Sequence, residues 1–163
     1  MAALSSACLW LVGAVVVGAL ANQLPLAWLS SPMGNVPPER VTQWLATYEQ
    51  RLGIRSWKRW IPDAGHALPG GIRKASLARR DPAALQRLVA ETRRAEWVHG
   101  LLWPLWLLTL LWLPASGVLI NLLFATVFNL PCLLLQRYNR LRLRLLLART
   151  PACLSAPTSR LPG

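Results

Sequence analysis

The stretch WVHGLLWPLWLLTLLWLPASGVLINLLFATVFNLPCLLLQ, residues 97–136, is the longest uncharged run in the chain and decides its fold. As a single helix it would be about 60 Å long, twice the thickness of the hydrocarbon layer of a bilayer. The segment Pro114-Ala115-Ser116-Gly117 breaks the run, since proline and glycine favour turns. We therefore expect a two-span hairpin over residues 97–135, with helices at 97–113 and 117–135.

Apolar and charged residues are segregated along the whole chain. Of its 163 residues 54% are hydrophobic, and 18 Lys and Arg against 6 Asp and Glu give a net charge of +12. No charged side chain precedes Glu39, and none lies between Glu96 and Arg137. This pattern excludes intrinsic disorder, a disulfide-rich secreted scaffold and a simple soluble domain. It predicts one all-α membrane domain over residues 1–163.

The first apolar block, residues 4–29, is long enough for a transmembrane helix. Trp10 and Trp28 lie near its two ends, where indole rings favour the membrane interface. Ala19-Leu20-Ala21 resembles a signal-peptidase site, so the block is either an uncleaved anchor or a cleaved signal peptide. The positively charged segment that usually opens a signal peptide is missing, which favours the anchor.

The basic residues lie in two segments. Residues 36–96 carry twelve Lys and Arg with all six acids, and residues 137–163 carry six Arg with no acid. Basic segments stay on the cytoplasmic side, and a two-span hairpin between them satisfies that rule for both. We expect a multi-pass cell-membrane protein whose polar middle and C-terminal tail are cytoplasmic, with an external N-terminus if the first block is retained.

The polar middle, residues 36–96, is expected to be interfacial and largely helical. Pro37-Pro38-Glu39 predicts a helix start, and Gly53 can end that amphipathic helix. Residues 54–80 are rich in glycine and proline and predict a loop. Asp81-Pro82 predicts the start of a second helix, which runs into the apolar block.

The tail begins with a basic helix over residues 136–149. Arg137, Arg140 and Arg144 share one helical face, which suits either contact with anionic lipid or a site for a phosphate or carboxylate. Residues 150–163 contain three prolines and are predicted to be disordered.

Two acid–base pairs are candidates for catalysis. Glu96 and His99 are three residues apart on one helix at the membrane surface, so the carboxylate can orient the imidazole for proton abstraction. Ordinary interfacial polar residues would show the same spacing. Asp63 and His66 form a reserve pair in the loop. We expect no metal or cofactor, because one Glu-x-x-His motif does not make a di-iron site and no CxxC motif is present.

Four sequence blocks together resemble the glycosyl-4,4'-diaponeurosporenoate acyltransferase family. They are Trp57-Lys58 with Pro62-Asp63-Ala64-Gly65, Glu91-Thr92-Arg93-Arg94-Ala95-Glu96 with His99, Asn129-Leu130-Pro131-Cys132, and Gln136-Arg137-Tyr138-Asn139-Arg140. The resemblance covers about residues 40–149. It departs from the family pattern at Gly100, where the family has an aromatic residue.

The resemblance implies a small membrane enzyme that esterifies a fatty acyl group onto a sugar hydroxyl of a glycosylated C30 carotenoid acid or a related glycolipid, as in staphyloxanthin-type pigment synthesis. Its partners would be a lipid acyl donor and a glycosylated lipid acceptor. From the residues themselves, we expect His99, oriented by Glu96, to act as the general base. Other residues would bind substrate, the arginines by holding negative charge or a donor phosphate: Arg93, Arg94, Gln136, Arg137, Tyr138, Asn139 and Arg140.

A second hypothesis is a non-enzymatic membrane subunit or scaffold that binds anionic lipid or a protein partner through its arginine-rich faces. An enzyme requires these residues to converge on one cavity, whereas a scaffold would leave them dispersed. Nucleic-acid binding is not expected, because no recognition fold is visible.

Overall fold

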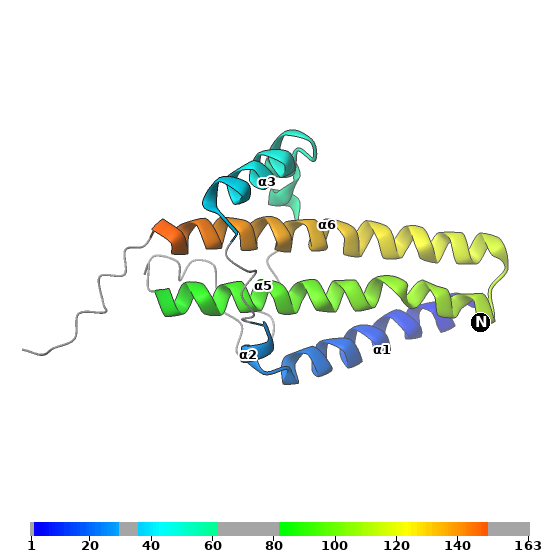
Figure 1. Ribbon diagram of the computed structural model, residues 1–163. Helices are drawn as coiled ribbons and strands as arrows, with labels where there is room; N and C mark the ends of the chain where they lie inside the picture. Colours follow the sequence, from blue (N-terminus) through cyan, green and yellow to red (C-terminus); the bar gives the residue numbers. More distant parts are fainter. Residues whose placement is uncertain (1, 30–35, 62–81, 150–163) are drawn as a thin grey trace, which may run out of the picture.

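The computed structural model describes residues 2–29, 36–61 and 82–149 (Figure 1). Every regular element in these ranges is helical, as predicted. The elements are α1 (Ala2–Gln23), α2 (Leu26–Leu29), α3 (Pro38–Gln50), α4 (Ile54–Trp57), the 3₁₀ helix η1 (Lys58–Trp60), α5 (Pro82–Leu102), the 3₁₀ helix η4 (Trp103–Leu111) and α6 (Ala115–Arg149). The loop predicted over residues 54–80 is wrong at its start, where Ile54–Trp57 and Lys58–Trp60 are helical. Its remaining residues from 62 onward, and the tail at 150–163, lie outside the described residues.

A long antiparallel hairpin forms the centre of the fold (Figure 1). α5 and η4 make its first arm, α6 makes its second, and the turn lies at residues 112–114. The predicted break at Pro114 is therefore confirmed. The separate basic helix expected at residues 136–149 is instead the last part of α6, which continues unbroken through Pro131.

The apolar part of the first arm is lengthened by its 3₁₀ segment. Pro104 has no N–H group, so the carbonyl of Gly100 loses its α-helical partner. A 3₁₀ helix rises about 2.0 Å per residue against 1.5 Å in an α-helix, which brings residues 97–111 to about 27 Å. This length approaches the hydrocarbon thickness of a bilayer, although the predicted α-helix over the same residues would be shorter.

α1 packs beside the apolar half of the hairpin, with its N-terminal end near the hairpin turn (Figure 1). The indole nitrogen of Trp10 donates to the Asn121 side-chain oxygen at 2.9 Å. A Cβ atom on Gly13 would lie 2.5 Å from the Leu105 Cδ1 atom, so glycine permits this close approach.

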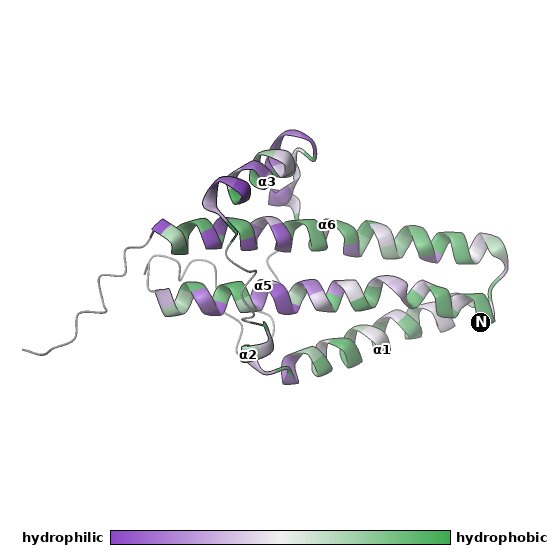
Figure 2. Ribbon diagram, viewed as in Figure 1, coloured by the Kyte–Doolittle hydropathy of each residue, from purple (hydrophilic) through white to green (hydrophobic). Residues whose placement is uncertain are grey.

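The surface of this half is apolar (Figure 2). Leu11, Val15 and Leu111 are 69%, 71% and 80% exposed, a surface that water does not favour. Two helices, α1 and α6, are long and apolar enough to cross a membrane. These features indicate a membrane-associated protein.

The polar half carries a small helical cap formed by α3 and α4, which lies on α6 (Figure 1). Pro38 opens α3 as predicted, and Gly53 adopts a left-handed conformation after it (φ 55°). Ile54 is fully buried and packs against Leu135 and Tyr138 of α6. The Tyr138 hydroxyl donates to the Glu49 carboxylate at 2.7 Å. These contacts fix the cap on the outer side of α6.

Candidate active site

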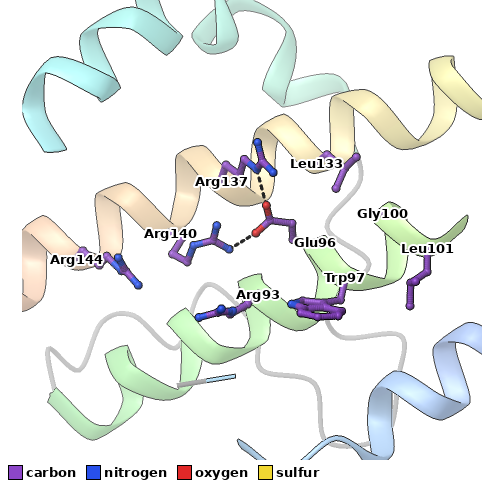
Figure 3. A pocket seen from close by; sticks show the side chains of 9 residues that line it. All are labelled: Arg93, Glu96, Trp97, Gly100, Leu101, Leu133, Arg137, Arg140 and Arg144. Atoms are coloured by element: carbon purple, nitrogen blue, oxygen red, sulfur yellow. Dashed lines mark hydrogen bonds and ion pairs between the residues drawn. The ribbon is translucent and has the colours of Figure 1, made fainter. Parts of the chain in front are cut away.

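A cavity of about 490 Å³ lies between the polar parts of α5 and α6 (Figure 3). Charged residues surround one part of it, and apolar residues surround the rest. Its lining residues are Arg93, Glu96, Trp97, Gly100, Leu101, Leu133, Arg137, Arg140 and Arg144. On each helix these residues recur every three or four positions, so each helix presents one face to the cavity.

Glu96 is the anionic centre of the cavity. It accepts a hydrogen bond from Arg137 Nε and forms a second ion pair with Arg140, both across the hairpin (Figure 3). The side chains of Glu96 and Arg140 are 15% and 13% exposed. Burial acts to raise the pKa of the Glu96 carboxyl, but hydrogen bonds and charge from Arg140 and Arg137 outweigh it and hold that pKa below its usual range.

The cavity has an excess of positive charge. In the part of the chain that the structure describes, four arginines line it against one carboxylate, and Glu96 is already paired with Arg137 and Arg140. Arg144 is partly buried and experiences repulsion from Arg140 and Arg93. An anion bound here would relieve this repulsion.

His99 has a different partner from the one expected. Its Nδ1 atom lies 3.1 Å from the Asn129 side-chain oxygen, while Glu96 is held by the two arginines. The expected Glu96–His99 pair is therefore wrong for this structure. The spacing of the two residues permits the contact, but guanidinium groups on the facing helix are stronger partners for a carboxylate.

The hydrogen bonds of Asn129 define the role of each His99 nitrogen. The Asn129 amide nitrogen donates to the Ala125 carbonyl at 2.9 Å, which directs the amide oxygen toward His99. An amide oxygen can only accept, so Nδ1 of a neutral His99 carries the proton and Nε2 is left able to accept one. Asn129 lies one helical turn from Leu133, a cavity residue, and so places His99 next to the cavity.

Two predicted substrate-binding residues make structural contacts. Arg94 donates to both carboxylate oxygens of Glu91 at 3.0 Å and to the Leu24 carbonyl at 3.4 Å, which ties α5 to the segment after α1. Tyr138 is 1% exposed and holds Glu49 of the cap. Neither residue lines the cavity.

Of the other predicted site residues, some line the cavity and others do not. Arg93, Arg137, Arg140 and Glu96 meet at the cavity, whereas Gln136 and Asn139 do not line it. Asp63 and His66 lie outside the described residues. Within the described ranges, no group of three His, Cys, Asp or Glu residues could hold a metal ion.

The sequence did not single out some residues that the structure places at the site. Trp97, Gly100, Leu101 and Leu133 line the apolar part of the cavity. Their spacing from Glu96 and Arg137 would have placed them on the same helical faces, but their residue types are ordinary in a membrane helix. Arg144 was recognised on the arginine face but was not assigned to the site.

The glycosyl-4,4'-diaponeurosporenoate acyltransferase family model matches residues 25–149. The chain belongs to this family. The match spans α5 and α6 in full and therefore both walls of the cavity. It confirms the family resemblance found in the sequence blocks.

Curated members of this acyltransferase family support the same assignment. Glycosyl-4,4'-diaponeurosporenoate acyltransferase from Staphylococcus aureus strain N315 is 34% identical over 97 residues, or 58% of this chain and 56% of that protein. The proteins of the same name from strains MRSA252 and USA300 are 34% and 33% identical over the same lengths. The match thus spans about half the length of these relatives. No solved structure matches the chain.

Proposed function

We propose that this protein is a membrane O-acyltransferase that esterifies a fatty acyl group onto a sugar hydroxyl of a glycosylated carotenoid or a related glycolipid. The relatives carry the name of such an enzyme. A donor and an acceptor of this kind would both be dissolved in the bilayer. A cavity at the boundary between the charged and apolar parts of the hairpin is a suitable place for them to meet.

The observation that most directly supports an enzyme is that candidate site residues from two helices line the same cavity. Glu96, Arg93, Arg137 and Arg140 come from two segments of the sequence and line one cavity. A scaffold that binds lipid through arginine-rich faces would leave these residues spread over its surface. Their arrangement instead favours a site that encloses a ligand.

His99 is the proposed general base. Its Nε2 atom would take the proton of the sugar hydroxyl as the sugar oxygen attacks the acyl carbonyl carbon. Arg137, which is more than half exposed, would stabilise the negative charge that develops on the carbonyl oxygen. The bond between the acyl carbon and the donor then breaks, which leaves the acyl group on the sugar oxygen. His99 passes its proton to the departing donor atom.

The remaining candidates have supporting roles in this proposal. The Asn139 amide nitrogen is buried without a hydrogen-bond partner among the described residues, so it could donate to a sugar after a small rearrangement. Gln136 is its neighbour in the same block. Asp63 and His66 stay a reserve acid–base pair.

The proposed topology is multi-pass, with α1, residues 97–111 and residues 115–135 crossing the bilayer and the cavity facing the cytoplasm. Single cysteines at Arg51, Ser116 and Arg149, in a chain without native cysteines, would test it. A membrane-impermeant thiol reagent applied to intact cells should label position 116 alone. Labelling of position 51 or 149 from outside would contradict the topology.

The reaction itself is tested by lipid and pigment profiling. Cells that make the glycosylated carotenoid are compared with and without the full-length gene. We expect a product heavier than the acceptor by one fatty acyl group, and only when the protein is present. Unchanged glycolipid and pigment profiles would exclude the proposed activity for these acceptors.

A further inference from the structure

We infer that the cavity between α5 and α6 binds the acyl donor, and that this donor carries both a phosphate and an acyl chain. The phosphate would lie at Arg144, and the chain would pass over Trp97 and Leu133 toward the bilayer. This inference rests on the proposed function and assigns one of its two substrates to a place and a chemical class.

The arginines of the cavity differ in whether Glu96 neutralises them. Arg137 and Arg140 are engaged by Glu96. Arg144 has neither an ion pair nor a hydrogen bond among the described residues, although it is partly buried and close to other positive charge. A partly buried cation without a counter-ion is unfavourable, so this end of the cavity suits an anion that the described residues do not supply.

The charge of the cavity selects the kind of anion that it can bind. Arg137, Arg140 and Arg144 against Glu96 give this part of the cavity a formal charge of +2 among the described residues. A glycosylated carotenoid ester has no charge to match it. A phosphate offers several acceptor oxygens and up to two negative charges, and guanidinium groups bind it in a bidentate manner.

The other end of the cavity is apolar and open. Trp97 and Leu101 are 52% and 51% exposed, and they lie beside Leu133 at the edge of the uncharged block. Gly100 adds no side chain between them, and a Cβ atom there would meet nothing nearer than Leu133 Cδ2 at 4.0 Å. An acyl chain could therefore leave the cavity along this side and enter the hydrocarbon layer.

The two ends define the orientation of the donor. Arg144 lies eleven positions after Leu133 on α6, which corresponds to about 16 Å along the helix. With its phosphate at Arg144 and its chain at Leu133, the donor would place its acyl carbonyl between these residues. That position is next to Glu96 and Arg137, about one helical turn from His99 along α5 and about two turns from Asn129 along α6.

Binding measurements on the purified full-length protein in nanodiscs of neutral lipid test this inference without requiring catalysis. The probes are palmitoyl-CoA, phosphatidylglycerol added to the nanodisc, and free palmitate. Arg144→Ala should weaken binding of a phosphate-bearing probe at least about tenfold, because a charge-assisted contact is lost. Arg144→Lys should restore part of the affinity, and Arg149→Ala, at the exposed end of the same helix, should leave it unchanged.

A second variant tests the apolar end. Gly100→Trp should weaken binding of both phosphate-bearing acyl probes while leaving competition by inorganic phosphate unchanged. Arg144-dependent binding of palmitoyl-CoA alone would identify a soluble thioester donor, and binding of phosphatidylglycerol alone a lipid donor. Each result would support the inference.

Equal affinity of the wild type and Arg144→Ala for both probes, or palmitate binding as tight as theirs, would overturn it. These results are independent of the proposed reaction. If acyl transfer is observed but does not depend on Arg144, only the donor site is wrong. If binding depends on Arg144 but no acylated glycolipid forms, the site stands and the acyltransferase proposal fails.

Discussion

Different kinds of interaction hold the helices together in the polar half and in the apolar half of the α5–α6 hairpin. In the polar half, Glu96 is paired with two arginines across the helices. In the apolar half the contacts are neutral: Trp103 donates to Thr126 at 3.2 Å, and Trp10 donates to Asn121 at 2.9 Å. Charges are expensive in hydrocarbon, whereas neutral hydrogen bonds are tolerated there. The comparison indicates that the site lies where charges can still be solvated, with His99 and Asn129 at the boundary.

The strongest test of this boundary is His99→Ala. We expect acyl transfer to fall about 10²–10⁴-fold, the usual contribution of a general base, with membrane insertion unchanged. Thr126→Ala is the matched control, since it removes a neutral contact of the apolar half and leaves His99 in place. Product formation by purified protein in nanodiscs is the measurement. Equal activity in His99→Ala and the wild type would remove His99 from the mechanism.

The second test compares two asparagines on the same face of α6. Asn129→Leu should lower kcat about 10–100-fold with little change in KM, because His99 loses the acceptor that fixes its Nδ1 proton. Asn121→Leu breaks the contact with Trp10 two turns away and should leave kcat close to normal. Similar kcat values in the two variants would show that Asn129 supports packing alone.

The hairpin and the arginine face could be predicted from the sequence because both depend on local patterns. A long uncharged run with Pro114 near its middle has few ways to fit a bilayer. Arginines at positions 137, 140 and 144 share a face on any regular helix.

The partners of Glu96 and His99 could not be predicted in the same way. Within one helix, spacing identifies only the neighbours three or four residues away. Arg137 is 41 residues from Glu96, and Asn129 is 30 residues from His99, so both contacts depend on the register of α6 against α5. That register is set by packing along the whole hairpin and by the length of its turn. The 3₁₀ segment at Trp103–Leu111, which the sequence did not suggest, changes the register further.

The third test concerns the ion pairs of the polar half. Glu96→Gln should destabilise the fold by about 1–3 kcal/mol at neutral pH, because Arg137 and Arg140 lose a charged acceptor. Glu91→Gln is the control, since it breaks an ion pair with Arg94 on a single helix and should destabilise the fold by only about 0.5 kcal/mol. Thermal unfolding in detergent would measure both. A smaller effect for Glu96→Gln than for Glu91→Gln would contradict the view that Glu96 joins the two helices.

The same glutamate predicts a pH dependence with a definite sign. The pKa of Glu96 is lower in the folded protein than in the unfolded chain, so its contribution to stability is complete above the unfolded value of about 4.3. That contribution is lost as the pH falls through the lower, folded pKa. Acidification from neutral pH should therefore destabilise the wild type more than Glu96→Gln. Parallel unfolding curves for the two proteins across this range would contradict the prediction.

The smallest expected effect lies in the apolar half, at α1. Trp10→Phe removes one neutral hydrogen bond within lipid and should destabilise the fold by about 1 kcal/mol or less. This contact also bears on whether α1 is retained as a membrane anchor or removed as a signal peptide. Ala21, which would end a signal-peptidase site, is helical and 4% exposed, so its position favours an uncleaved anchor. Intact mass of the purified membrane protein should thus include residues 1–21. A mass that begins at Asn22 would show that α1 is removed, in which case Trp10→Phe could not affect the stability of the mature protein and Asn121 would need another partner.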